Sequence, residues 1–195
     1  MTRMIFEQKQ PEMVVCKSGR AMIALNEQVV KAVESVPTGM TDEGEMRYEE
    51  REKEQYAYDV CWLENVGTEA DVLNSAKASV LADIEAYDTS TAVNGFILNG
   101  QRVWLDKATR VGLMNSTSIA KAMGQPTTTL WLGDAKLVVE CDKAIQLLSA
   151  LEMYALECFN VTAAHKKAVA EMSTVEEVLG YDYTAGYPEV LEMRV

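Results

Sequence analysis

The chain has 195 residues, of which 48% are hydrophobic, and it carries 30 acidic against 18 basic side chains for a net charge of −12. This length and apolar content allow one domain or two small ones with a buried core. A surface that binds nucleic acid needs clustered basic residues, so the acidic balance excludes nucleic acid as the expected partner. No run approaches the ~18 apolar residues that span a bilayer, and the run at residues 4–6 is too short for a signal peptide. We expect a soluble protein made in a cytoplasm, with no membrane partner.

Residues that carry metal and nucleophilic chemistry are sparse. Cys16, Cys61, Cys141 and Cys158 form no C-x-x-C pair and lie among apolar residues, which favours buried free thiols. His165 is the single histidine, so a multi-histidine metal centre is excluded, and no G-x-S-x-G serine motif accompanies it. P-loop, G-x-G-x-x-G, H-E-x-x-H and EF-hand patterns are absent as well. We therefore expect no enzymatic activity, no catalytic residue, no metal and no cofactor.

The first third of the chain predicts a small antiparallel sheet. Strand patterns occur at residues 4–8, 12–16, 20–25 and 55–64. A glycine-containing turn at residues 17–19 links the second of these to the third. Residues 26–36 fit both a helix and a strand, because their valines recur at helical spacing while β-branching favours a strand.

Residues 37–54 read PTGMTDEGEMRYEEREKE, which is charged and poor in apolar side chains. Such a run is typical of a solvated loop or a frayed helix, and an acidic patch that binds a partner is the alternative. We expect an acidic loop here, and it is the best candidate for disorder.

An amphipathic helix is predicted over residues 68–87. Thr68 and Asp71 have the spacing of a capping box at its start, and apolar residues recur every three or four positions after them. The polar link at residues 88–91 follows. It suggests a division into an N-terminal segment, residues 1–90, and a C-terminal domain, residues 91–195.

Two ββα units in tandem are predicted in that C-terminal domain. Asn99-Gly100 separates two apolar runs and favours a type I′ hairpin turn, after which Asp106 is placed to cap a helix that stops at Gly124. In the second unit Gly133-Asp134 makes the turn and Asp142 is the expected cap.

The second helix is expected to be long, over residues 143–172, and to bury one stripe along its length. His165 lies on that stripe. A half-buried imidazole bonded to a local carbonyl or carboxylate is the simpler interpretation, and a buried catalytic base is the alternative. Overlapping capping boxes at residues 173–177 predict a short last helix that stops at Gly180.

The tail after Gly180 is rich in tyrosine. Tyr181, Tyr183 and Tyr187 are expected to staple the tail over the core, because a tyrosine ring is apolar and its hydroxyl is polar. The alternative is a stacking platform for carbohydrate, with Trp104 and Trp131 as further members. These five aromatic residues are the candidate interaction surface.

Several of these segments together resemble a known family. GFILNGQRVWLDKATRVGLMNS, the strand TTLWL, the helical run LLSALEMYALECFNVTAAH and the ending TVEEVLGYDYTAGYPE are similar to an uncharacterised domain family of bacteriophage and prophage tail-region proteins. The resemblance covers about residues 93–189. It implies a role in the virion or tail, and the family has no established activity or catalytic residues to carry over.

We expect an α+β protein, with a small antiparallel β segment plus a helix followed by tandem ββα units. The resemblance implies a structural protein of a phage tail or tail fibre that is made in the bacterial host cytoplasm and located in the virion. Its partners would be other tail or fibre proteins and further copies of itself. The alternatives are a tail-fibre assembly chaperone and a carbohydrate-binding module.

Overall fold

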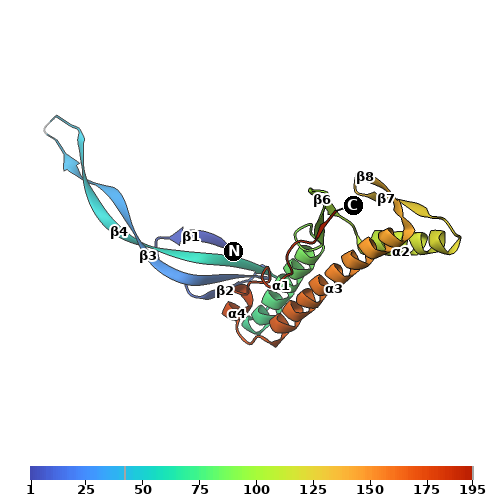
Figure 1. Ribbon diagram of the computed structural model, residues 1–195. Helices are drawn as coiled ribbons and strands as arrows, with labels where there is room; N and C mark the ends of the chain where they lie inside the picture. The colour runs from blue at the N-terminus through green and yellow to red at the C-terminus, as the bar shows by residue number, and fades with distance from the viewer. Residues whose placement is uncertain (42, 195) are drawn as a thin grey trace. The chain divides into compact units, whose positions relative to one another are not determined.

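The computed structural model describes residues 1–41 and 43–194 and has the predicted α+β fold. The chain divides into two compact units (Figure 1). One unit contains residues 1–79 and 173–179, and the other contains residues 80–172 and 180–195. The division therefore falls inside a helix, whereas the sequence suggested the polar link after it. The short segment at residues 173–179 belongs to the first unit.

The first unit is built on an antiparallel sheet with strand order β1-β4-β3-β2. Its strands are β1 (Thr2–Phe6), β2 (Met13–Cys16), β3 (Arg20–Met40) and β4 (Met46–Glu64). Gly19 has a positive φ of 79°, which only glycine adopts without strain, in the turn that joins β2 to β3. The best-buried side chains, among them Ala21, Tyr58 and Leu63, lie where β1 or β2 adds a third strand to the β3–β4 pair. The predicted sheet is confirmed.

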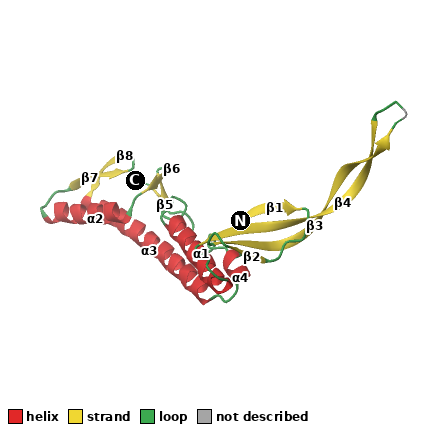
Figure 2. Ribbon diagram, turned by 180° about the vertical axis from the view of Figure 1, so that it is seen from behind, coloured by secondary structure: helices red, strands yellow, loops and turns green. Residues whose placement is uncertain are grey.

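The expected acidic loop at residues 37–54 is wrong. Most of this segment is strand: β3 runs on to Met40 and β4 begins at Met46, and the two pair continuously from Val29 opposite Tyr56 to Met40 opposite Met46, with one register shift. The ambiguous residues 26–36 belong to β3. Both faces of this hairpin are largely exposed. Its sequence therefore lacks the alternation of apolar and polar residues that identifies a half-buried strand, and the charged run resembles a loop. We call residues 30–40 and 46–55 the arm (Figures 1 and 2).

The predicted helix near residue 68 is confirmed as a 3₁₀ turn, η1 (Glu69–Asp71), that leads into α1 (Val72–Asp88). Asp71 accepts a hydrogen bond from the Thr68 backbone N–H at 2.9 Å, as a capping residue does. The short helix α4 (Val175–Leu179) is also where the capping pattern placed it, and Thr174 Oγ1 accepts from the Glu177 N–H at 3.2 Å.

The first ββα unit comprises β5 (Gly95–Leu98), β6 (Gln101–Trp104) and α2 (Lys107–Ala122). Asn99 and Gly100 have φ angles of 49° and 83°, as a type I′ turn requires. Asp106 caps α2, because its side chain accepts the Thr109 N–H at 2.9 Å. That bond and the one from the Thr109 hydroxyl lower the pKa of Asp106.

The second ββα unit comprises β7 (Thr127–Leu132), β8 (Ala135–Glu140) and α3 (Cys141–Glu171). The expected cap at Asp142 is wrong, because α3 begins two residues earlier than expected and Glu140, which makes no side-chain capping bond, occupies the N-cap position. Asp142 lies instead in the first turn of α3, where it forms an ion pair with Lys121 of α2. The two units thus share a topology but start their helices differently.

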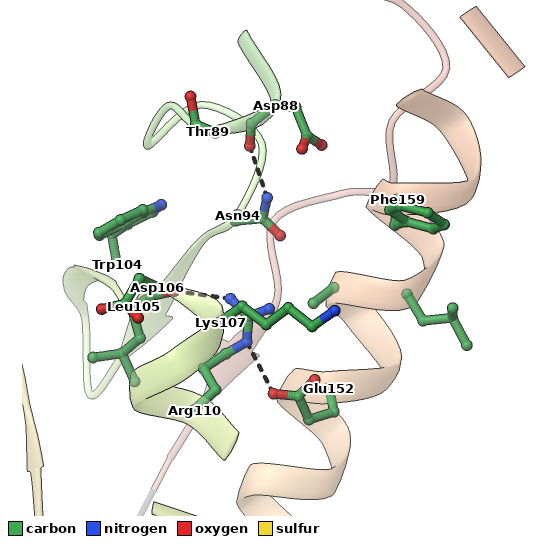
Figure 3. Close-up of a pocket in the computed structure, with 12 residues that line it drawn as sticks. Asp88, Thr89, Asn94, Trp104, Leu105, Asp106, Lys107, Arg110, Glu152 and Phe159 are labelled. Atoms are coloured by element: carbon green, nitrogen blue, oxygen red, sulfur yellow. Dashed lines mark hydrogen bonds and ion pairs between the residues drawn. The ribbon is translucent and has the colours of Figure 1, made fainter. Parts of the chain in front are cut away.

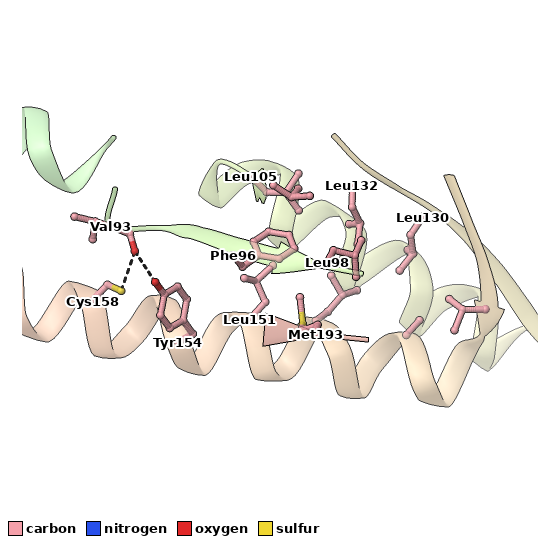
Figure 4. Close-up of a cluster of buried hydrophobic side chains, with 14 residues drawn as sticks. Val93, Phe96, Leu98, Leu105, Leu130, Leu132, Leu151, Tyr154, Cys158 and Met193 are labelled. Atoms are coloured by element: carbon pink, nitrogen blue, oxygen red, sulfur yellow. Dashed lines mark hydrogen bonds between the residues drawn. The ribbon is translucent and has the colours of Figure 1, made fainter. Parts of the chain in front are cut away.

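The core of the second unit collects buried side chains from both ββα units against α3 (Figure 4). Phe96 is fully buried there, and the Tyr154 hydroxyl donates to the carbonyl of Val93 at 2.9 Å. Burial raises the pKa of Tyr154 to about 12, with the neighbouring Cys158 thiol adding to the effect. A further strand, β9 (Glu192–Met193), pairs in parallel with β5 and was not predicted.

Two further observations concern cysteines and membranes. None of the four cysteines forms a disulfide bond. Cys141 and Cys158 are buried and Cys16 and Cys61 are half-buried, which agrees only in part with the expected buried thiols. Among the described residues, none of the helices has the length and apolar character needed to cross a membrane.

Candidate functional site

The tyrosine-rich tail is held against α1 and α3 by a set of hydrogen bonds that we call the tail lock. His165 Nε2 lies 2.9 Å from the carbonyl oxygen of Ala185, and Nδ1 lies 2.7 Å from the hydroxyl of Tyr181. A carbonyl oxygen only accepts, so Nε2 donates to Ala185, and in the tautomer with a proton on Nε2 alone Nδ1 accepts from the Tyr181 hydroxyl. The simpler interpretation of His165 is thereby supported, and the carbonyl comes from the tail rather than from a neighbouring turn.

Tyr187 completes the tail lock. The hydroxyl of Thr162 donates to Asp88 at 2.7 Å, so the Tyr187 hydroxyl, 2.9 Å from Thr162 Oγ1, is the donor of that second bond. Desolvation raises the pKa of Tyr187, and also that of Tyr183.

The tail aromatic rings meet at steep angles. Tyr183 and Tyr187 pack on Tyr87 with interplanar angles of 70° and 63°, and all three tail tyrosines are partly buried. A carbohydrate platform needs exposed, roughly coplanar rings, because sugar faces stack on them. The geometry therefore favours the staple over the platform for Tyr181, Tyr183 and Tyr187.

The two tryptophans of the candidate surface have separate surroundings. Trp131 in β7 is 57% exposed, and the Lys136 ammonium lies 5.9 Å from the centre of its ring. Trp104 at the end of β6 is 38% exposed and lines a cavity to which Trp131 does not contribute. The predicted five-residue surface is thus divided among the tail lock, the β7–β8 hairpin and this cavity.

The cavity has a volume of about 480 Å³ and lies within the second unit (Figure 3). The segment from β6 into α2 forms one wall with Trp104 and Lys107, and α3 forms the other with Glu152 and Phe159. Pockets that bind small molecules in proteins occupy about 300–1,000 Å³. The volume is therefore sufficient for a small ligand.

Arg110 is the polar centre of this cavity. The side chain is almost fully buried, its Nε donates to Glu152 at 3.0 Å, and its Nη1 donates to the carbonyl of Leu105 at 2.8 Å. Glu152 lies on α3, so this ion pair joins α3 to the start of α2. Sequence reasoning missed Arg110, although a basic residue on the buried side of a helix, three residues before Leu113 and four before Met114, was a usable signal.

The cavity provides no arrangement for a metal ion. Among residues 1–41 and 43–194, histidine, cysteine and carboxylate side chains do not gather in groups of three or more that could hold one. The carboxylates that line the cavity are instead bonded to protein donors, as Glu152 is to Arg110.

The cavity and most of the tail lock fall inside a segment that matches a known family. A family model described as a domain of unknown function, DUF4376, matches residues 75–185, which is more than half of the chain. The chain belongs to the DUF4376 family. No curated protein and no solved structure shows significant similarity to the chain. The arm, Tyr187 and β9 lie outside the DUF4376 match.

Proposed function

We propose that this DUF4376 protein is a non-enzymatic structural protein of a bacteriophage or prophage tail or tail fibre. It would act in the virion through contacts with other tail or fibre proteins and with further copies of itself, after synthesis in the host cytoplasm. The sequence resemblance supplies the phage setting. The observation that carries the contact role is the arm.

The arm has the properties of an element that binds a partner. β1 pairs only with residues 56–60 of β4, and β2 pairs only with residues 20–23 of β3, so the outer edges of both arm strands are open. A two-stranded ribbon without further cover is marginally stable in water, and open edges are where partner strands add. A contact with another protein would stabilise the arm.

The arm also exposes apolar side chains far from the sheet core. Val33, Met40 and Tyr48 are 65%, 70% and 63% exposed, and Met46 faces Met40 across the end of the ribbon. Each would remove apolar surface from water in an interface, worth about 25 cal/mol per Å². The arm also carries exposed charged side chains, such as the cross-strand ion pair of Lys31 with Glu52 at 2.7 Å, which are of the kind that hinders non-specific pairing at open edges.

The tail lock supports a structural role as well. Both ring nitrogens of His165 are occupied by bonds that hold the tail, so the single imidazole of the chain serves the fold. A general base needs one nitrogen within reach of a substrate proton.

Purified phage particles test this proposal. Quantitative mass spectrometry of particles from a lysogen that carries the gene should find the protein in a fixed copy number per particle. A variant in which Asn-Gly replaces residues 31–54 should fold and yet be lost from the particles. Met153→Ala, which changes an exposed side chain outside the arm, is the control and should be incorporated normally.

Two outcomes would contradict the proposal. Absence of the unaltered protein from particles, together with its co-purification with a fibre protein from lysates, would identify an assembly chaperone instead. Normal incorporation of the arm-shortened variant would show that the contact is made elsewhere on the chain.

A further inference from the structure

Charged side chains of both signs line the cavity beside Arg110. Its three carboxylates each accept from a protein group: Asp88 from Thr162 at 2.7 Å, Asp106 from the Thr109 hydroxyl at 2.6 Å, and Glu152 from Arg110. Carboxylates engaged in this way are compensated by donors from the protein itself.

The two cations of the cavity are less completely engaged. A guanidinium carries five N–H groups, and the bonds from Arg110 to Glu152 and Leu105 use two of them. The ammonium of Lys107 has neither a hydrogen bond nor an ion pair with the part of the chain that the structure describes, and it lines the same cavity. N–H groups of both cations are therefore left for a ligand that supplies acceptor oxygens.

Several of the other lining side chains are apolar and exposed. Trp104, Leu156 and Phe159 are 38%, 48% and 61% exposed, and Ala155 lies next to Leu156 on α3. Figure 3 shows the rings of Trp104 and Phe159 on either side of the Lys107 side chain. Aromatic walls with a few convergent polar groups are typical of a small-molecule site.

We propose that this cavity binds a small carboxylate with an aromatic or similarly apolar body. The carboxylate accepts from the Lys107 ammonium and from the unused N–H groups of Arg110, since charge-assisted bonds to a carboxylate are the stronger ones. The body lies against Trp104, Leu156 and Phe159. The site is separate from the arm, and this assignment does not rest on the proposed tail function.

Two probes of the same body and opposite charge test the site. We would titrate 3-phenylpropionate and 3-phenylpropylamine into the full chain and follow backbone amide shifts by NMR. The carboxylate should bind with shifts confined to residues around the cavity, and the amine should bind at least tenfold more weakly. Higher salt should weaken carboxylate binding, because the contact with the exposed Lys107 is screened.

Matched variants then locate the two halves of the ligand. Lys107→Gln should weaken carboxylate binding about tenfold, whereas Lys143→Gln, at an exposed lysine outside the cavity, should leave it unchanged. Phe159→Ala should weaken it by about fivefold or more, and Met153→Ala, at another exposed apolar position on α3, should not. All four positions are exposed, so the variants should fold.

The proposal is overturned by any of three results. Neither probe binds, the amine binds as tightly as the carboxylate, or Lys107→Gln binds the carboxylate like the unaltered protein. Amide shifts confined to residues remote from the cavity would also overturn it, because they would show that the probe does not bind in the cavity.

Discussion

The arm and the core of the second unit use the same chain in opposite ways. In the core, residues from two ββα units and β9 meet α3, and side chains such as Phe96, Leu148 and Leu151 lose nearly all contact with water. In the arm, two strands pair over ten positions or more while apolar side chains such as Val33 and Tyr48 stay in water. Hydrogen bonding within the backbone is thus common to both regions, and burial separates them. Backbone hydrogen bonds therefore order both regions, but only the core gains stability from burying its own apolar side chains.

The largest difference between the two regions should appear on removing an aromatic side chain. Phe96→Ala should lower the free energy of unfolding of the second unit by about 3–5 kcal/mol, because the substitution leaves a cavity in a fully buried position. Tyr48→Ala in the arm should change the free energy of unfolding by less than about 0.5 kcal/mol. Urea denaturation followed by tryptophan fluorescence in a Trp62→Phe background would measure both. Similar losses for the two variants would contradict the comparison.

A smaller effect is expected from one buried hydroxyl at high pH. The pKa of Tyr154 is about 12 in the folded protein, above the ordinary value of about 10, so the folded state favours the neutral phenol. The resulting stability, about 2–3 kcal/mol, is fully present below pH 10 and is lost as the pH rises from 10 to 12.

Tyr154→Phe removes this titration and isolates it. Urea denaturation at pH 9 and pH 11.5 should show a smaller loss for Tyr154→Phe than for the unaltered protein. Tyr48→Phe, in the exposed arm, should lose as much as the unaltered protein. An identical pH dependence for all three proteins would contradict a raised pKa at Tyr154.

The tail lock should contribute less than the core. Tyr181→Phe removes the hydroxyl that donates to His165, and should destabilise the second unit by about 1 kcal/mol. Amide hydrogen exchange should speed up around Ala185, whose carbonyl bonds to the same ring. Tyr183→Phe is the control, since Tyr183 packs on Tyr87 through its ring, which phenylalanine keeps. Equal effects of the two variants would assign the stability to ring packing alone.

The smallest effect is expected from the arm itself. Replacement of residues 31–54 by Asn-Gly should change the unfolding free energy of either unit by less than about 1 kcal/mol, because exposed ion pairs and an uncovered ribbon contribute little. Urea denaturation of the shortened and full chains would measure this. A large loss would show that the arm stabilises the protein that bears it, and the comparison drawn above would then fail.

Local chemistry made much of the fold predictable. The Asn99-Gly100 turn and the Asp106 cap depend on residues within three or four positions of each other, and both are as the sequence indicated. Asp142 shows the limit of such reasoning, because the same pattern one unit later starts its helix two residues earlier and uses the carboxylate for an ion pair with Lys121. A repeated motif predicts topology better than it predicts the role of each residue.

The arm and the cavity could not be predicted, because both depend on contacts between residues far apart in the sequence. The arm depends on a register between residues up to 25 positions apart, from Val30 to Gln55, while its sequence has the charge of a loop. The ion pair at the centre of the cavity joins Arg110 to Glu152, 42 positions away, and neither residue has a local signal for the other. Trp104 was predicted as a surface residue, but the cavity that it lines needs the packing of α2 and α3 to be known.

The arm also sets a length scale. Residues 30–40 form a strand segment of eleven residues, and a strand rises about 3.3 Å per residue, so the ribbon reaches about 35 Å from the covered part of its sheet. A partner bound at Met40 and Met46 would be held at that distance from the sheet, with a thin bridge of two strands between them. In an assembly of many copies, such a bridge would act as a spacer, because the separation of neighbouring subunits would follow from the number of residues in the hairpin.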